Sequence, residues 1–313
     1  MSALRPLYLL VAFVVIVGLA CSAGGPLAPS QSGSGWQLLS AGGGAAPGQE
    51  LAFGGEGTGP GLFQDGRGLA VNTATGAMAV ADYQDGRIQA FDPTGKVVTQ
   101  WTVPNAVKDT IIRNMAGDAQ GNVFVVTSGS ILKYDSSQKL KATWSPNDSG
   151  INSVAVEANG NIVAAADDET IYQLSPTGKV LMTIKNSFSD NGGDAELDTY
   201  VAIDSAGDIY ALGTFNNAVF KFSTKGKLIN QFGGEGNSPG KFDAPGSIAV
   251  DSQGRVYVGD FKGIQVFAGD GTYQTLIPIK GVGAVRFITF DAQDNLYVTT
   301  GDGKVLKLRV PKS

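Results

Sequence analysis

The amino-acid sequence predicts an all-β fold built from six repeated units, and three observations support this. A short apolar run ends in an acid or amide, and a turn then leads to a second apolar run. The acid or amide recurs every 39 to 47 residues, at Asn72, Asp118, Glu157, Asp204, Asp251 and Asp291. The 313 residues include 44 Gly, which suits many tight turns. A period in the forties with several short strands per unit indicates a six-bladed β-propeller with one blade per repeat.

Each unit predicts four strands, and the first of them is the innermost. Small and β-branched residues dominate it, as crowding around an axis requires, at residues 68–71, 114–117, 153–156, 200–203, 247–250 and 287–290. A turn with Gly, or with Asp294-Asn295 in the sixth unit, leads into the second strand. Third strands such as RIQAFD alternate strictly, which indicates one buried face. Fourth strands are expected at 97–101, 140–144, 179–184, 227–232 and 273–277.

The sixth unit lacks a fourth strand of its own. The segment GQELAFGG at residues 48–55 matches INQFGG at 229–234, which belongs to a fourth strand. We therefore predict that the N-terminal strand ELAF, residues 50–53, closes the last blade. Closing the ring in this way removes its exposed sheet edges.

The first 21 residues have the pattern of a secretion signal. Arg5 gives a positive start, and the apolar stretch from 7 to 20 is short for a spanning helix, which needs about 20 residues. Cys21 resembles the acylated cysteine that ends a bacterial lipobox. We therefore expect an extracytoplasmic protein, anchored in the membrane of a bacterial cell envelope by lipidation at Cys21. Residues 22–49 then form a flexible Gly/Ser/Pro-rich tether to a propeller at 50–313. An ordinary signal peptide and an uncleaved anchor are the alternatives.

The composition excludes several function classes. The net charge of −5 disfavours a nucleic-acid partner, which normally meets a basic face. The chain has no histidine, so a Ser-His triad and every histidine-ligated metal site are excluded. A single cysteine excludes an internal disulfide.

The units resemble NHL repeats, which form six-bladed propellers. The matching segments span residues 50 to 313, and they are FGGEGTGPGLF (53–63), ADYQDGRIQAFD (81–92), FGGEGNSPGKF (232–242) and SIAVDSQGRVYVGDFKGIQVF (247–267). This resemblance implies the fold more than the function, because relatives include ligand-binding modules, peptide-amidating lyases and RNA-binding domains. The lyases use histidine-bound zinc, which this chain cannot build. Related lactonases need a Glu on the first inner strand, where this chain has Leu69-Ala70-Val71.

A candidate site lies on the rim where the inner strands begin. Five residues before each register acid or amide stand Arg67, Arg113, Asn152, Thr199, Gly246 and Arg286. The three arginines belong to blades six, one and two, which are neighbours in a closed ring. Converging guanidinium groups bind a carboxylate, sulfate or phosphate. The alternative is structural pairing of each arginine with a rim acid such as Asp65, Asp82 or Asp302.

Aromatic side chains are expected on the same rim, at Tyr83, Tyr200, Phe215, Phe261 and Phe287. Tyr83 and Phe261 stand in turns flanked by charge, which favours exposure and contact with a ligand. For Tyr200 and Phe287 we expect packing between blades instead.

Acids also gather near the rim, at Asp82, Asp167, Asp168 and Asp260. They either form a carboxylate ring around a metal or cap their own turns, and turn chemistry is the favoured interpretation. The acidic loop at 187–198 either binds calcium or is simply solvated, and it lacks the spacing of a calcium loop. We expect neither a metal nor another cofactor.

The sequence as a whole predicts a non-catalytic, envelope-anchored propeller. Its rim would bind a small anionic ligand or a protein partner through Arg67, Arg113, Arg286, Asn152, Tyr83 and Phe261. The alternative is a propeller enzyme, a lactonase or lyase with a histidine-free site.

Overall fold

The computed structural model describes residues 48–311 except 108, 128, 147–149 and 280–282. The signal segment, Cys21 and nearly all of the predicted tether lie outside the described residues, so their roles stay predictions. In the described part of the chain, no helix has the length and hydropathy needed to cross a membrane.

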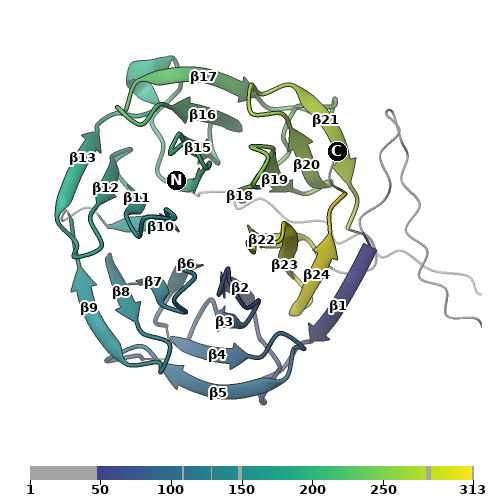
Figure 1. The fold of residues 1–313 in the computed structure, drawn as a ribbon. Coiled ribbons are helices and arrows are strands. Elements are labelled where there is room, and N and C mark those ends of the chain that lie inside the picture. Colours follow the sequence, from purple (N-terminus) through teal and green to yellow (C-terminus); the bar gives the residue numbers. More distant parts are fainter. Residues whose placement is uncertain (1–47, 108, 128, 147–149, 280–282, 312–313) are drawn as a thin grey trace, which may run out of the picture. The chain divides into compact units, whose positions relative to one another are not determined.

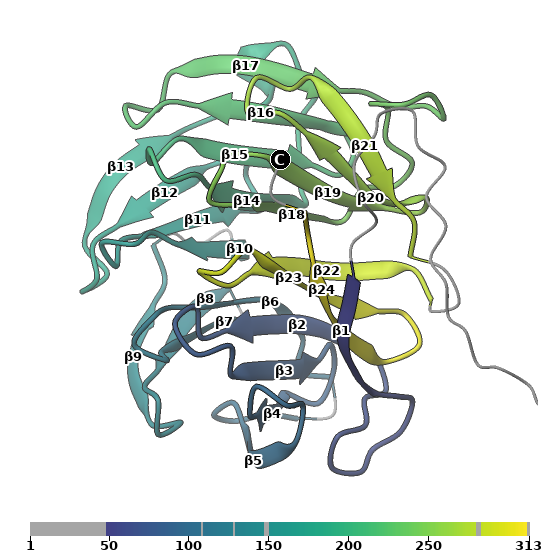
Figure 2. The same ribbon diagram turned by 45° about the vertical axis from the view of Figure 1, so that its right-hand side comes forward.

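Six antiparallel four-stranded sheets are arranged in a ring, which confirms the all-β six-bladed propeller (Figures 1 and 2). Blade one consists of β2 (Gly66–Val71), β3 (Met78–Asp82), β4 (Arg87–Phe91) and β5 (Val97–Thr102). Blade two consists of β6 (Ile112–Gly117), β7 (Val123–Thr127), β8 (Ser130–Tyr134) and β9 (Leu140–Trp144). Blade three consists of β10 (Ile151–Val156), β11 (Ile162–Ala166), β12 (Ile171–Leu174) and β13 (Val180–Ile184).

The second half of the ring repeats this order. Blade four consists of β14 (Thr199–Ile203), β15 (Ile209–Gly213), β16 (Ala218–Phe222) and β17 (Leu228–Gly233), preceded by the short 3₁₀ turn η1 (Ser189–Asn191). Blade five consists of β18 (Ser247–Val250), β19 (Val256–Asp260), β20 (Gly263–Phe267) and β21 (Tyr273–Ile277). Blade six consists of β22 (Val285–Phe290), β23 (Asn295–Thr300), β24 (Lys304–Arg309) and β1 (Gly48–Gly54).

The N-terminal strand closes the last blade, as the sequence predicts. β1 pairs antiparallel with β24, with Leu51 opposite Lys307 and Phe53 opposite Val305. The carboxylate of Glu50 forms ion pairs with Lys307 and Arg309 on that neighbouring strand. Chain segments from both ends of the propeller therefore share one sheet at its outer edge (Figure 2).

The repeated acid or amide has a local structural role. The side chain of Asp118 accepts hydrogen bonds from the backbone N–H groups of Gln120 and Asn122, at 3.0 and 2.8 Å. Asp204, Asp251 and Asp291 make the same two contacts in their own turns. The side chain thus satisfies backbone donors that the tight turn between the first two strands leaves unpaired.

The apolar core lies between the blades. Across one interface, the ring of Tyr257 on β19 packs against Phe290 at the end of β22, with centroids 4.8 Å apart. At the corresponding place in another interface, Tyr297 of β23 clusters with Val71 of β2. Each blade therefore presents a second-strand side chain to the inner strand of the next blade, and this contact holds the ring together.

The two FGG-containing segments are loops pinned by buried phenylalanines. Phe63 and Phe242 are fully buried and contact Phe91 and Phe267 of the third strands. A Cβ at Gly233 would collide with the ring of Phe242, which explains the glycine there. These loops bring residues 63–65 and 242–244 to the rim where the inner strands begin.

Candidate functional site

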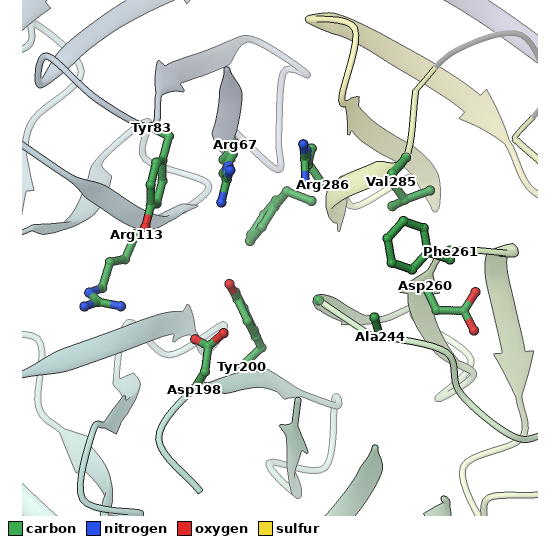
Figure 3. A pocket seen from close by; sticks show the side chains of 13 residues that line it. Arg67, Tyr83, Arg113, Asp198, Tyr200, Ala244, Asp260, Phe261, Val285 and Arg286 are labelled. Atoms are coloured by element: carbon green, nitrogen blue, oxygen red, sulfur yellow. The ribbon is translucent and has the colours of Figure 1, made fainter. Parts of the chain in front are cut away.

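A cavity of about 280 Å³ opens at the end of the ring where the inner strands begin. Its lining comes from five blades, and the main side chains are Arg67, Tyr83, Arg113, Asp198, Tyr200, Asp260, Phe261, Arg286 and Phe287. Figure 3 shows the arginines, Tyr83, Asp198 and Tyr200 around the cavity, with Phe261 on another side. The position five residues before the register acid or amide thus contributes to a shared site in blades one, two, five and six.

Arg67 is held in place on two sides. Its Nε and one terminal nitrogen donate to the Oδ2 atom of Asp65, at 2.9 and 2.7 Å. The guanidinium carbon lies 4.1 Å from the centre of the Tyr83 ring, a cation–π contact. The guanidinium plane is therefore fixed before any ligand arrives.

The other two arginines are held much less. Arg286 lies 3.9 Å from the Oδ1 atom of Asp65, which is already paired with Arg67. No described acid lies within ion-pair distance of Arg113, an exposed residue on β6. Among the described residues, ion pairing therefore compensates the charge of Arg67 fully and that of Arg286 in part. Within the same residues, it does not compensate the charge of Arg113.

Asp198 and Tyr200 form the opposite wall, on the loop and strand that begin blade four. Burial raises the pKa of the Asp198 carboxyl, and the positive charge of Arg113 opposes that shift. Nearby Glu196 and Asp167 add to the increase. Burial also raises the pKa of the Tyr200 hydroxyl, so it stays protonated at neutral pH. Both side chains point into the cavity in Figure 3, where the hydroxyl can donate a hydrogen bond to a ligand.

The remaining wall is apolar and partly open. Phe261, in the turn after β19, is 70% exposed, whereas Phe287 on β22 is buried. Beside them the backbone of Ala244 has φ of +49°, in the left-handed region. A residue other than glycine adopts this conformation when the surrounding structure holds it there. Here the buried Phe242, two residues earlier, holds the loop.

The structure brings most of the predicted rim residues together. Arg67, Arg113, Arg286, Tyr83 and Phe261 all line the cavity. Asn152 does not, because its side chain is buried and its amide donates to the backbone oxygen of Leu197 at 2.7 Å. Asn152 thus supports the loop that carries Asp198, and this corrects its predicted place on the rim surface.

The expectation for two aromatic residues was incomplete, and one lining acid was missed. Tyr200 and Phe287 pack against the apolar clusters between blades, as expected, and both also line the cavity. Asp198 was not singled out, although it directly precedes Thr199, the blade-four counterpart of the arginine position. Adjacency to that register position was the available signal. Phe215 is 67% exposed and does not line the cavity.

The predicted turn acids take part in turn and ion-pair chemistry. Asp82 pairs with Arg87, and Asp260 accepts from Gln265 at 2.8 Å and lies 3.9 Å from Lys262. In the acidic loop, the buried carboxylate of Glu196 accepts from the backbone N–H groups of residues 215 and 216, each at 3.1 Å. Within the described ranges, no group of three or more acids, Cys or His is placed to hold a metal ion.

Comparison with known proteins adds to this picture, although no family model matches the chain. Human NHL repeat-containing protein 3 is 36% identical over 95 residues, which are 27% of this chain and 27% of that protein. This match covers part of the repeat region and agrees with the ring of six blades. The chain is an NHL-like six-bladed β-propeller. The match spans about a quarter of the length of that curated relative.

More distant similarities extend over more of the NHL-like propeller. A lambda-carrageenase from Pseudoalteromonas sp is 24% identical over 252 residues, 77% of this chain and 23% of that enzyme. A gluconolactonase from Xanthomonas campestris superposes with a TM-score of 0.60 at 20% identity, covering 79% of this chain and 86% of the other. A virginiamycin B lyase from Staphylococcus aureus superposes with a TM-score of 0.59 at 15% identity, covering 79% and 95%. At such identities the structural similarities show the fold alone.

Proposed function

We propose that this propeller is a binding protein whose rim cavity takes an anionic, ring-shaped ligand, with acidic sugars as the favoured class. One observation carries this: three guanidinium groups meet at one cavity, and Asp65 is the described acid that pairs with two of them. Like charges brought together repel, so the cluster favours a bound anion that compensates it.

The walls of the cavity suit the rest of such a ligand. Arg113 supplies a cation without a described ion-pair partner, and Tyr200 supplies a hydroxyl donor. Phe261 and Phe287 supply apolar surface against which the face of a sugar ring packs. A hydrogen bond from a charged group contributes about 1.5–3 kcal/mol when sheltered from water. A Kd of 1 mM requires about 4 kcal/mol, so contacts from more than one of these side chains must act together.

Calorimetric titration of glucuronate and of sulfate tests the proposal, with glucose as the uncharged comparison. We expect both anions to bind and glucose not to bind. Arg113→Ala should weaken anion binding by about tenfold or more, the equivalent of ~1.4 kcal/mol. Arg309→Ala is the matched control, because it removes the same charge from a 73% exposed side chain on β24, the third strand of blade six. Absence of anion binding, or equal weakening by both variants, would contradict the proposal.

A second candidate function is catalysis at the same cavity. Asp198 has a raised pKa inside the cavity and lies near a protonated tyrosine, a combination that supports general acid–base chemistry. The gluconolactonase and lyase propellers make a histidine-free lactonase or lyase the class to test. Hydrolysis of aldonolactones, measured by the protons it releases, should then depend on Asp198 and be lost in Asp198→Asn. Binding without turnover leaves the non-catalytic proposal in place.

We further propose that the protein is held at the bacterial cell envelope by lipidation of Cys21, outside the cytoplasm and without a nucleic-acid partner. The support is the sequence alone: a short apolar stretch, a single cysteine at its end and a Gly/Ser/Pro-rich segment after it. This arrangement would leave the rim cavity available to soluble ligands or to a protein partner.

A further inference from the structure

A second cavity, of about 290 Å³, lies between blades one and two at the other end of the same strands. Its lining includes the end of β2, the start of β3 and the end of β6. Ala79, Ala90 and Gly117 form its small-residue wall, and the indole of Trp101 on β5 also lines it. The arginine cavity lies where β2 and β6 begin, so the two cavities are separate.

The cavity exists because one interface lacks the side chains that fill the others. The corresponding contact between blades five and six is the Tyr257 ring against Phe290. Between blades one and two the same two positions are Ala79 and Gly117. The inner strand of every other blade ends in Val, Ile or Phe where β6 ends in glycine. A Cβ at Gly117 would collide with the backbone oxygen of Val71, so the two inner strands approach closely there.

Blade one also lacks the polar group that caps this region elsewhere. In blade four the register acid Asp204 accepts from the Tyr210 hydroxyl at 3.1 Å and lies 3.5 Å from Lys221. Tyr210 and Lys221 are direct cross-strand partners. The corresponding cross-strand pair in blade one is Ala79 and Ala90, and the register position is the neutral Asn72. Acid, ring and cation are therefore all replaced by smaller or uncharged groups.

The lining indicates the charge of an occupant. Its described residues include no lysine or arginine, and the carboxylates among them belong to Asp92 and Asp135. Each of these accepts hydrogen bonds within its own turn, from the residue-94 and residue-137 backbones among others. The two carboxylates disfavour an anion, and Asp135 already has a cationic partner in Lys141, at 3.9 Å. The alanine and glycine wall leaves room for an uncharged ring.

We propose that this cavity is a binding site for an uncharged aromatic molecule. Its ring would occupy the space that the Tyr257 ring occupies between blades five and six, with Trp101 as part of the wall. A cavity of about 150 Å³ lined by apolar side chains holds benzene, so this one has room for a substituted ring. The site is independent of the anion site, and neither proposal depends on the other.

The test uses p-cresol, the side-chain analogue of tyrosine, and the full chain labelled at alanine methyl groups. We expect saturable NMR shifts of the Ala79 and Ala90 methyls. Ala79→Tyr restores the residue found in blades four, five and six, and it should weaken p-cresol binding by about tenfold or more. Ala90→Lys, which restores the residue of blades two, four and six, is the second variant in case Ala79→Tyr fails to fold.

Two controls separate the sites. Arg113→Ala should leave the p-cresol affinity unchanged, and benzoate should not shift the Ala79 and Ala90 methyls. Shifts confined to the rim residues, no saturable shift, or unchanged p-cresol binding in a folded Ala79→Tyr or Ala90→Lys variant would each overturn the proposal.

Discussion

At the scale of residues, arginines at the same position of the repeat differ in their acidic neighbours. Arg67 and Arg113 occupy the same register position in adjacent blades, yet only Arg67 has an adjacent acid, two residues earlier at Asp65. Asp65 is also the closest acid to Arg286, so one carboxylate serves two cations. Arg113 instead faces Asp198 at a longer range, as the shift of the Asp198 pKa indicates. Occupancy by an anion therefore depends most on Arg113.

Replacing Asp198 by Asn should make stability less dependent on pH. The folded-state pKa of Asp198 is raised, so its protonated form contributes stability that is present below the ordinary value of 3.8 and is lost as pH rises through the raised pKa. In thermal melts, the melting temperature of Asp198→Asn should therefore rise relative to that of the parent as pH increases above the ordinary pKa of 3.8.

Asp92 provides a contrast for that experiment. The Thr94 hydroxyl donates to its carboxylate and lowers its pKa, so ionised Asp92 stabilises the fold above the ordinary pKa and that stability is lost as pH falls. Asp92→Asn should accordingly lose stability relative to the parent as pH rises. If the melting temperatures of both variants shift in the same direction relative to the parent, burial does not determine the pKa of Asp198.

The arginine cluster could be predicted from the sequence because its three members occupy the same position of the repeat. Identical register positions in adjacent blades must meet at one rim once the ring closes, whatever the side chains are. Asp198 was harder to find because the loop before β14 has no counterpart of equal length in the other blades. The burial of Asn152 was also hidden, since it depends on the backbone of Leu197, 45 residues away.

At the scale of elements, the fold depends on strands finding partners far away in the sequence. β1 has no local partner and pairs with β24 near the other end of the propeller. Its Phe53 also contacts Phe91 of blade one, with ring centroids 4.7 Å apart. A single strand therefore completes one sheet and joins it to the next blade. The first of these roles was predicted because residues 48–55 match the fourth-strand segment at 229–234 and the sixth unit lacks a fourth strand of its own.

Shortening the N-terminal segment tests the role of β1. Deleting residues 22–46 should leave the melting temperature nearly unchanged, because β1 begins at Gly48. Deleting 22–55 exposes the edge of β24 and its buried Leu306 and Leu308, and should lower the melting temperature or cause aggregation. Equal melting temperatures for the two deletions would contradict closure by β1.

A point variant tests the same closure without changing chain length. Phe53→Ala removes the contact with Phe91 and should lower the free energy of unfolding by about 2–4 kcal/mol in denaturant titrations. Val98→Ala, at a 65% exposed position on outer strand β5, should change it by about 0.5 kcal/mol or less. A small effect at Phe53 would mean that β1 pairs without helping to join blades six and one.

The cavity between blades one and two could not be predicted from the repeat pattern alone. Ala79, Ala90 and Gly117 have low strand propensity, yet the pattern of each repeat still predicts their strands. Their consequence appears only when second-strand and inner-strand positions of adjacent blades are known to face each other. Alignment of the six units would have shown the missing ring, but not the close approach of Gly117 to Val71.

At the scale of the whole propeller, the two cavities use opposite ends of the same strands. Arg67 lines one cavity and Val71 lines the other, and four residue steps along β2 separate the two residues by roughly 13 Å. Effects at such separations usually add. An anion at the rim and an aromatic molecule between blades one and two should accordingly bind without competing.

The attachment of the propeller to a membrane is the last prediction, and it depends on Cys21. An acylated cysteine binds membranes because each buried methylene contributes about 0.8 kcal/mol, and stable anchoring takes more than one chain or signal. The wild-type protein should therefore sediment with membranes, whereas Cys21→Ser should be released or remain uncleaved. Ser22→Ala is the control, since it changes the adjacent residue and keeps the thiol. Mass spectrometry of the mature N-terminus separates the alternatives: a mature chain that begins elsewhere than Cys21 indicates an ordinary signal peptide. A Cys21→Ser protein that is processed and sediments like the parent would show that lipidation is not what holds it.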